Sequence, residues 1–272
     1  MPAWICATCG NHYPESDDPP AACVICADER QWVPRSGQRW TTHEELVAGD
    51  RHTEIWEVEP GLLGIGVTPS VGIGQRALLV QTGQGNLLWD PPGFVDDQAI
   101  EQVRAAGGLT AVTASHPHFY GAMADWAHAF DAELLVPEAD RDWVTYPDPA
   151  IRYWAGRVDV LPGVTLIQCG GHFPGSAVVH VAAAAGGAGA LLTGDTIFVT
   201  PGEDRLSFIW SAPNRLPLPE PLIRGILDAV RPFAFDRIHG GWAPTISEGA
   251  REALEASAAR YIQFLRGEAP ED

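Results

Sequence analysis

Hydrophobic residues along the chain fall into short runs bounded by glycine and proline, and these runs predict β-strands. They span residues 55–58, 62–67, 77–81, 87–89, 109–114, 134–136, 165–168, 177–181 and 190–192. Helices are predicted over residues 96–106, 121–130, 220–230 and 247–265. Strands come first and then alternate with helices, twice over. This order predicts an α+β fold, a four-layer αββα sandwich.

Four of the five cysteines set the N-terminal region apart. They form two C-x-x-C pairs with thirteen residues between them: Cys6, Cys9, Cys23 and Cys26. Each pair lets two thiolates reach one ion from a tight turn, so the pairs predict one tetrahedral four-sulfur site for zinc or iron. Two disulfides are the alternative, which a reducing cytosol disfavours. Because about 30 residues build no core of their own, we expect the metal to supply much of the folding free energy.

The first cysteine pair has a further signature. The segment W-I-C-A-T-C-G-N-H-Y at residues 4–13 resembles the first metal knuckle of rubredoxin and rubrerythrin modules. Ala27 stands where rubredoxins usually have glycine, which favours a structural zinc over a redox iron. We therefore predict a rubredoxin-like or zinc-ribbon module over residues 1–30, here called the four-cysteine module. A connector over 31–53 with one short helix and a main domain over 54–272 would follow it.

The composition limits the partners of the protein. Apolar residues make up 46% of the chain, enough for a substantial core. Seventeen basic and 35 acidic residues give a formal charge of −18, so we expect binding to neither nucleic acid nor an anionic membrane. Lysine is absent, which excludes a lysine Schiff base. The N-terminus shows no signal-peptide pattern, and prolines and glycines interrupt the uncharged run 160–194, so we expect a cytoplasmic protein without a membrane span.

Two histidines one residue apart follow the predicted buried strand at residues 109–114. They are His116 and His118. Residues i and i+2 of an extended chain point the same way, so the two imidazoles converge at the strand end. Such a pair forms half of a site for a divalent metal.

Three later polar residues extend this pattern. His172 lies in a G-H-F-P-G turn, Asp195 follows an apolar strand, and His239 precedes two glycines. In order and spacing, these residues and the histidine pair resemble the metal ligands of the metallo-β-lactamase fold superfamily, over residues 54–265. The resemblance implies the αββα metallo-β-lactamase sandwich, with Asp90 bracing the metal loop rather than binding metal.

The superfamily pattern H-x-H-x-D-H is broken at its end. Tyr120 and Gly121 stand where an aspartate and a histidine would bind a second metal. We therefore predict one ion, zinc or iron, with Asp195 as a fourth or nearby ligand beside His116, His118 and His172. His239 would bind a second ion if one were present. Either Asp195 or Tyr120 would orient the attacking water, and Tyr120 or His239 would assist the leaving group, unless Tyr120 only packs.

These residues predict a metal-dependent hydrolase of a small-molecule ester, thioester, lactone or amide, acting through a metal-bound hydroxide at a mononuclear site. One alternative is a mononuclear iron oxidoreductase or dioxygenase with His116, His172 and Asp195 as ligands. The four-cysteine module would then carry electrons and require a redox partner. A second alternative is a binding protein that has lost catalysis.

Overall fold

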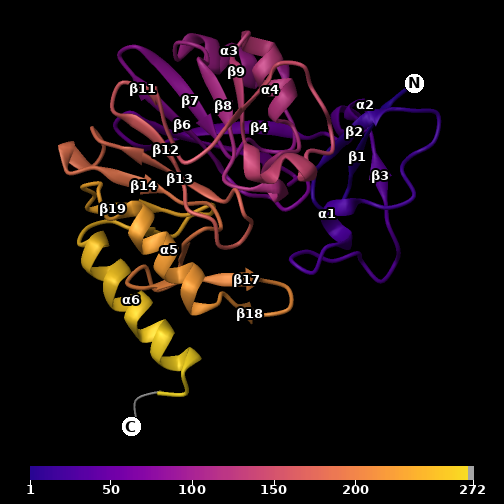
Figure 1. Cartoon of the computed structure of the whole chain (residues 1–272). Coiled ribbons are helices and arrows are strands. Elements are labelled where there is room, and N and C mark those ends of the chain that lie inside the picture. The colour runs from indigo at the N-terminus through magenta and orange to yellow at the C-terminus, as the bar shows by residue number, and fades with distance from the viewer. Residues whose placement is uncertain (269–272) are drawn as a thin grey trace.

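The computed structural model describes residues 1–268, and two mixed β-sheets face each other in its main domain (Figure 1). The strands of the first sheet are β4 (His52–Glu59), β5 (Leu62–Thr68), β6 (Ala77–Thr82), β7 (Gly85–Trp89), β8 (Ala111–Thr113), β9 (Glu133–Pro137) and β10 (Ile151–Trp154). They lie in the order β10-β9-β8-β7-β6-β5-β4, antiparallel from β4 to β7 and parallel from β7 to β10. The parallel part brings the carboxyl ends of β7 and β8 to one edge of the sheet.

The second sheet has both hairpins and one crossover. Its strands are β11 (Arg157–Leu161), β12 (Val164–Gln168), β13 (Ala177–Val181), β14 (Ala190–Leu192), β19 (Arg237–His239) and β20 (Thr245–Ile246), which lie in this order. Of its neighbouring pairs, β14 and β19 are parallel and the others antiparallel. The chain segment that connects β14 to β19 contains two small hairpins. They are formed by β15 (Phe198–Val199) with β16 (Leu206–Ser207) and by β17 (Ile209–Ser211) with β18 (Leu216–Pro217).

Helices cover the outer face of each sheet. Those on the first sheet are α3 (Asp97–Ala105) and α4 (Met123–Phe130), and those on the second are α5 (Glu220–Val230) and α6 (Ala250–Leu265). Three short 3₁₀ turns are η1 (Pro117–Phe119), η2 (Glu138–Trp143) and η3 (Ala185–Gly187).

Side chains along a single strand alternate between two hydrophobic layers. In β6, Leu79 packs with residues of α3 and α4, while Leu78 and Val80 lie between the two sheets. In β13, Val178 packs with α5 and α6, while Val179 faces the first sheet. The predicted four-layer αββα sandwich is therefore confirmed.

The N-terminal residues form a small sheet of their own. Its strands are β1 (Ala3–Cys6), β2 (His12–Glu15) and β3 (Trp40–Thr41), in the order β2-β1-β3, and two short helices accompany it, α1 (Val24–Ala27) and α2 (His43–Ala48). Because β3 pairs with β1, part of the predicted connector belongs to the same sheet as the first knuckle. The four cysteines and Ile25 form the buried centre of this module. Figure 1 shows the module, in indigo, at one side of the sandwich.

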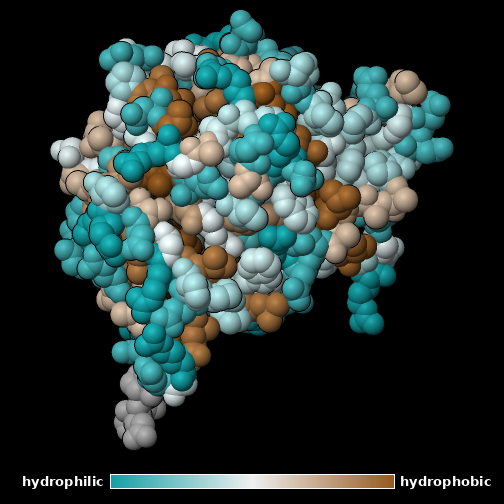
Figure 2. All heavy atoms as spheres, viewed as in Figure 1, coloured by the Kyte–Doolittle hydropathy of each residue, from teal (hydrophilic) through white to brown (hydrophobic). Residues whose placement is uncertain are grey.

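The predicted helices lie close to the observed ones. Helix α5 has the predicted ends, and the other three helices of the main domain begin or end within three residues of prediction. Hydrophilic residues cover most of the face in Figure 2, where hydrophobic residues appear in small separate groups. Across residues 1–268, the structure contains no helix with both the length and the apolar content needed to cross a bilayer.

Candidate metal centres

Three loops bring four polar side chains together inside the main domain. His116 and His118 follow β8, with His118 in the turn η1, whereas His172 follows β12 and Asp195 follows β14. Their candidate ligand atoms all lie within 4.8 Å of one another. The four side chains form the histidine cluster, which is buried, since their exposed fractions are 0%, 3%, 2% and 7%.

The distances in the histidine cluster match those between ligands of one ion. His118 Nδ1 and His172 Nε2 are 3.4 Å apart, and His116 Nε2 lies 3.5 Å from Asp195 Oδ2. Ligands about 2.0 Å from a tetrahedral zinc ion lie about 3.3 Å apart. Within residues 1–268, His116 Nε2 and Asp195 Oδ1 are buried without a hydrogen-bond partner. Buried polar atoms are rarely left unpaired, so the donor set fits a metal ion.

Burial keeps the imidazoles in the form that binds metal. Loss of solvent lowers the pKa of His116 and His118 well below 6.5, and it lowers that of His172 to about 4. The positive charge of Arg30 acts in the same direction on all three. Burial and the nearby Asp90 raise the pKa of Asp195, a carboxyl that a cation would return to its charged form. At neutral pH the histidines are therefore neutral ligands.

The loop that carries His116 is braced from β7. Asp90 Oδ1 accepts a hydrogen bond of 2.6 Å from the Ser115 backbone N–H, and Ser115 Oγ lies 2.8 Å from His116 Nδ1. This arrangement confirms that Asp90 braces the loop. Gly194 has a φ of +48°, and a Cβ there would lie 2.2 Å from Ser115 Oγ, so only glycine fits before Asp195.

Two predicted site residues have partners away from the histidine cluster. The Tyr120 hydroxyl donates to Asp140 Oδ2 at 3.3 Å. His239 Nε2 lies 3.1 Å from Glu59 Oε1, and His239 Nδ1 lies 3.3 Å from Thr245 Oγ1. Across residues 1–268, His239 is not grouped with the three histidines and Asp195. The catalytic roles of Tyr120 and His239 stay predictions.

The structure also gathers the four N-terminal cysteines. The Sγ atoms of Cys6 and Cys26 are 3.6 Å apart, and those of Cys9 and Cys23 are 3.5 Å apart. Sulfurs about 2.3 Å from one tetrahedral ion lie about 3.8 Å apart, so the cluster fits a single metal. The sulfurs accept hydrogen bonds from the side chains of Asn11, Tyr13 and Gln38. A hydrogen bond from the Cys26 thiol lowers the pKa of Cys23 to about 7, whereas contacts with Cys23 raise the pKa of Cys9 and Cys26, so the thiols share their protons until a cation replaces them.

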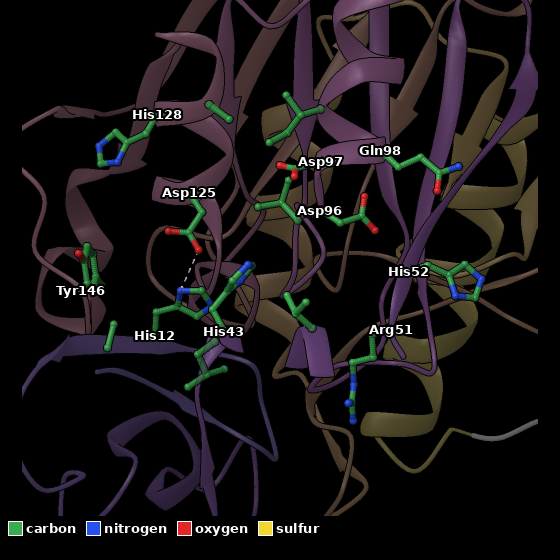
Figure 3. A pocket seen from close by; sticks show the side chains of 16 residues that line it. His12, His43, Arg51, His52, Asp96, Asp97, Gln98, Asp125, His128 and Tyr146 are labelled. Carbon is green, nitrogen blue, oxygen red and sulfur yellow. Dashed lines mark ion pairs between the residues drawn. The ribbon is translucent and has the colours of Figure 1, made fainter. Parts of the chain in front are cut away.

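A cavity of about 900 Å³ lies between the four-cysteine module and the helices α3 and α4 (Figure 3). His12 and Asp125 form an ion pair of 3.3 Å at its wall, beside the ring of His43. Within the described chain, none of the four residues of the histidine cluster lines this cavity. The cavity is therefore separate from the candidate metal centres.

Comparisons with known proteins agree with this fold. The protein is 39% identical over 270 residues to the uncharacterized protein YmaE of Bacillus subtilis (strain 168), in a match that covers 98% of each chain. Its fold is similar to that of VMB-1, with a TM-score of 0.58, 13% identity and coverage of 79% of this chain and 98% of that one. A metallo beta lactamase from Erythrobacter litoralis gives a TM-score of 0.51, 17% identity and coverage of 79% and 97%. Residues 70–257 match the family model for the metallo-beta-lactamase superfamily, and this chain belongs to that superfamily.

Proposed function

We propose that the protein is a metal-dependent hydrolase of a small molecule in the cytoplasm, with one ion at the histidine cluster. The observation that carries this proposal is the set of four buried ligand atoms at the spacing of a single coordination sphere. An ion bound there would supply a Lewis acid that polarises a carbonyl group and makes water more acidic. Suitable substrates are esters, thioesters, lactones and amides.

The surroundings of the histidine cluster support one ion rather than two. A side chain at Gly121 would place its Cβ 2.2 Å from the backbone oxygen of Gly10, so the four-cysteine module fills the space of a further ligand. The hydroxyl of Tyr120 is directed to Asp140, and His239 is held by Glu59. The residues that would complete a second site are therefore absent or engaged elsewhere in residues 1–268.

Asp195 is the residue best placed to handle a proton. Its Oδ1 atom is buried and has no partner in the described chain, whereas Oδ2 faces His116. A carboxylate in this position can orient a water molecule and accept its proton at the oxygen that is not bound to the ion. This role needs no contribution from Tyr120 or His239.

The test measures metal content and hydrolysis in the same samples. We expect one ion at the histidine cluster in addition to that of the cysteines, and turnover on a panel of esters, thioesters, lactones and amides. His116→Ala should lose the ion, and Asp195→Asn should lower turnover by about 100-fold or more, since general-base catalysis contributes about 10²–10⁴-fold. His128→Ala, which changes an exposed histidine of α4, is the matched control. Wild-type protein that holds the ion but hydrolyses the panel no faster than Asp195→Asn would refute the proposal.

A second candidate is a mononuclear iron oxidoreductase, and one observation favours it. The side chain of Asn11 contacts both Cys9 Sγ, at 3.5 Å, and the backbone oxygen of His118, at 3.3 Å. An electron on an iron held by the four cysteines would therefore lie one side chain away from the histidine cluster. Visible absorption separates the candidates, because an iron tetrathiolate is coloured and a zinc tetrathiolate is colourless.

A further inference from the structure

Each knuckle of the four-cysteine module delivers one side chain to the backbone of a loop that carries a cluster histidine. Asn11 comes two residues after Cys9 of the first knuckle, and Arg30 comes four residues after Cys26 of the second. Both side chains are buried, with residue exposures of 0% and 7%. The two contacts reach different histidines, so together they hold the cluster from the module side.

Asn11 connects the first knuckle with the loop of His118. Its Nδ2 lies 3.5 Å from Cys9 Sγ and 3.3 Å from the backbone oxygens of both Pro117 and His118. All three of these atoms accept hydrogen bonds, so the NH₂ group must face them. On its other side, Asn11 Oδ1 lies 3.4 Å from Thr145 Oγ1, whose single proton also reaches the His12 backbone oxygen at 2.8 Å. The amide is therefore fixed in one orientation, between a sulfur of the four-cysteine site and the backbone of a cluster histidine.

Arg30 connects the second knuckle with the loop of His172. Its Nη1 donates to the His172 backbone oxygen at 3.1 Å, and its Nε and Nη2 bind both oxygens of Asp28, at 2.6 and 3.0 Å. The guanidinium also lies over the ring of Phe173, 3.7 Å from the ring centre, and within 5.0 Å of the ring centres of Trp143 and Trp210. A planar group paired in this way can adopt few other positions.

We propose that Asn11 and Arg30 are positioning residues through which an ion in the four-cysteine site sets the geometry of His118 and His172. The inference rests on the proposed metal at the histidine cluster. The module is too small to hold its shape by packing alone, so its ion fixes where the two knuckles lie. Because the knuckles hold the two loops, the sites bind metal cooperatively. The cooperativity is reciprocal, since filling either site raises the affinity of the other by the same factor.

The test uses full-length protein with Co²⁺ as the probe, because a cobalt tetrathiolate and a cobalt site of histidine and aspartate have different absorption spectra. Asn11→Asp keeps the shape of the side chain and removes its N–H donors. Arg30→Met keeps much of the length and removes the charge and the donors. Each change should weaken Co²⁺ binding at the histidine cluster by about 10- to 100-fold, the usual effect of losing a partner of a metal ligand. Each should also shift the spectrum of the bound ion.

Gln38→Ala is the matched control. Gln38 Nε2 donates to Cys6 Sγ at 3.2 Å, as Asn11 does to Cys9. Its remaining hydrogen bonds are with the backbone oxygen of Arg39 and the backbone N–H of Cys23, and none is with a histidine loop. Its loss should leave Co²⁺ affinity at the histidine cluster within about twofold of wild type, because the ligand loops keep their partners.

Three outcomes decide the inference. If Asn11→Asp and Arg30→Met bind Co²⁺ at the cluster as tightly as wild type, the inference is wrong. If Asn11→Asp also loses the ion of the four cysteines, Arg30→Met decides alone, since Arg30 bonds to Asp28 and His172 rather than to a cysteine. A wild-type cluster that binds no Co²⁺ beside a filled four-cysteine site would overturn the proposed function as well as this inference.

Discussion

At the scale of single residues, Gly121 shows how closely the module approaches the metal loop. A Cβ at this position would lie 2.2 Å from Gly10 O and 3.5 Å from the Cα atom of Asn11. The backbone of Gly121 lies outside the left-handed region, so its conformation suits alanine and only the space forbids it. The close approach of Gly10 to Gly121 is therefore possible only because Gly121 has no side chain.

Gly121→Ala should lower the free energy of unfolding by about 1–3 kcal/mol, the usual cost of overpacking. Chemical denaturation measures the difference. The control is Gly225→Ala in α5, where an added Cβ has no neighbour within 4 Å among residues 1–268. That change should raise the free energy of unfolding by about 0.5–1 kcal/mol, because alanine favours the helix. Equal stability of the two variants would show that the module does not press against Gly121.

His239 has a structural partner, so its loss should affect stability rather than metal content. His239→Ala leaves Glu59 buried with Arg237 as its remaining partner, which should cost about 1–3 kcal/mol. Metal analysis should find the same number of ions as in wild type. A variant that lost one ion would instead place His239 in a second metal site.

Local patterns predicted the residues of the histidine cluster but not the partners of Tyr120 and His239. The spacing of His116 and His118 and the strand before them are visible within about ten residues. In contrast, the Glu59 that holds His239 is 180 positions away along the chain, and only folding brings the two together. Asn11 and Arg30 likewise carry no signal in the sequence beyond their position after a cysteine pair.

At the scale of elements, Asp140 joins the turn η2 to the loop that follows His172. Its Oδ1 accepts a hydrogen bond of 2.7 Å from the Gly175 N–H, and its Oδ2 accepts one from Tyr120. Burial raises the pKa of Asp140 from 3.8 to about 6. The folded protein therefore binds this proton more tightly than the unfolded chain does.

This shift predicts a dependence of stability on pH. The contribution of the Asp140 proton is complete below pH 3.8 and is lost as the pH rises through about 6. Relative to Asp140→Asn, which does not titrate, wild type should lose about 2–2.5 kcal/mol of unfolding free energy between about pH 4 and pH 7. Denaturation of both proteins at a series of pH values measures this. A constant difference between them would contradict the shift.

The elements with a clear periodicity were predicted well, whereas the strands β10, β11, β19 and β20 were not predicted. Helix α5 and the central strands have apolar residues at regular spacing, which sequence patterns detect. The edge strands β10 and β11 have one neighbouring strand each and carry exposed or half-buried residues, so their sequences lack that regularity. They form because β9 and β12 present free backbone groups beside them.

At the scale of the whole molecule, the ion of the four-cysteine site should stabilise more than its own module. Removing it with a chelator should lower the melting temperature by about 10 °C, because about 1 kcal/mol corresponds to 2–4 °C in a chain of this size and several docking contacts are lost together. Differential scanning calorimetry measures the change. Cys169→Ser, which alters the cysteine outside the cluster, should keep the ion and the wild-type response to chelator. An unchanged melting temperature after loss of the ion would show that the module contributes nothing to the stability of the sandwich.

Both parts of the molecule could be predicted separately, but the contact between them could not. Each part has a local pattern, in the cysteine pairs and in the alternating strands and helices. Docking instead depends on the shape of two folded surfaces, such as the fit of Arg30 against Phe173 and Trp210. No short window of sequence contains both sides of that surface.

The docking of an N-terminal module onto loops made much later sets an order of events during biosynthesis. Cys26 precedes His116 by 90 positions, so the ribosome completes both knuckles before it adds the first cluster histidine. At about 5–20 residues per second, the interval is about 5–20 seconds. The four-cysteine module of the nascent chain can therefore bind its ion first. The loops of the histidine cluster can then fold against a module that is already ordered. A cell starved of that ion during translation would then accumulate chains whose second site is also misassembled.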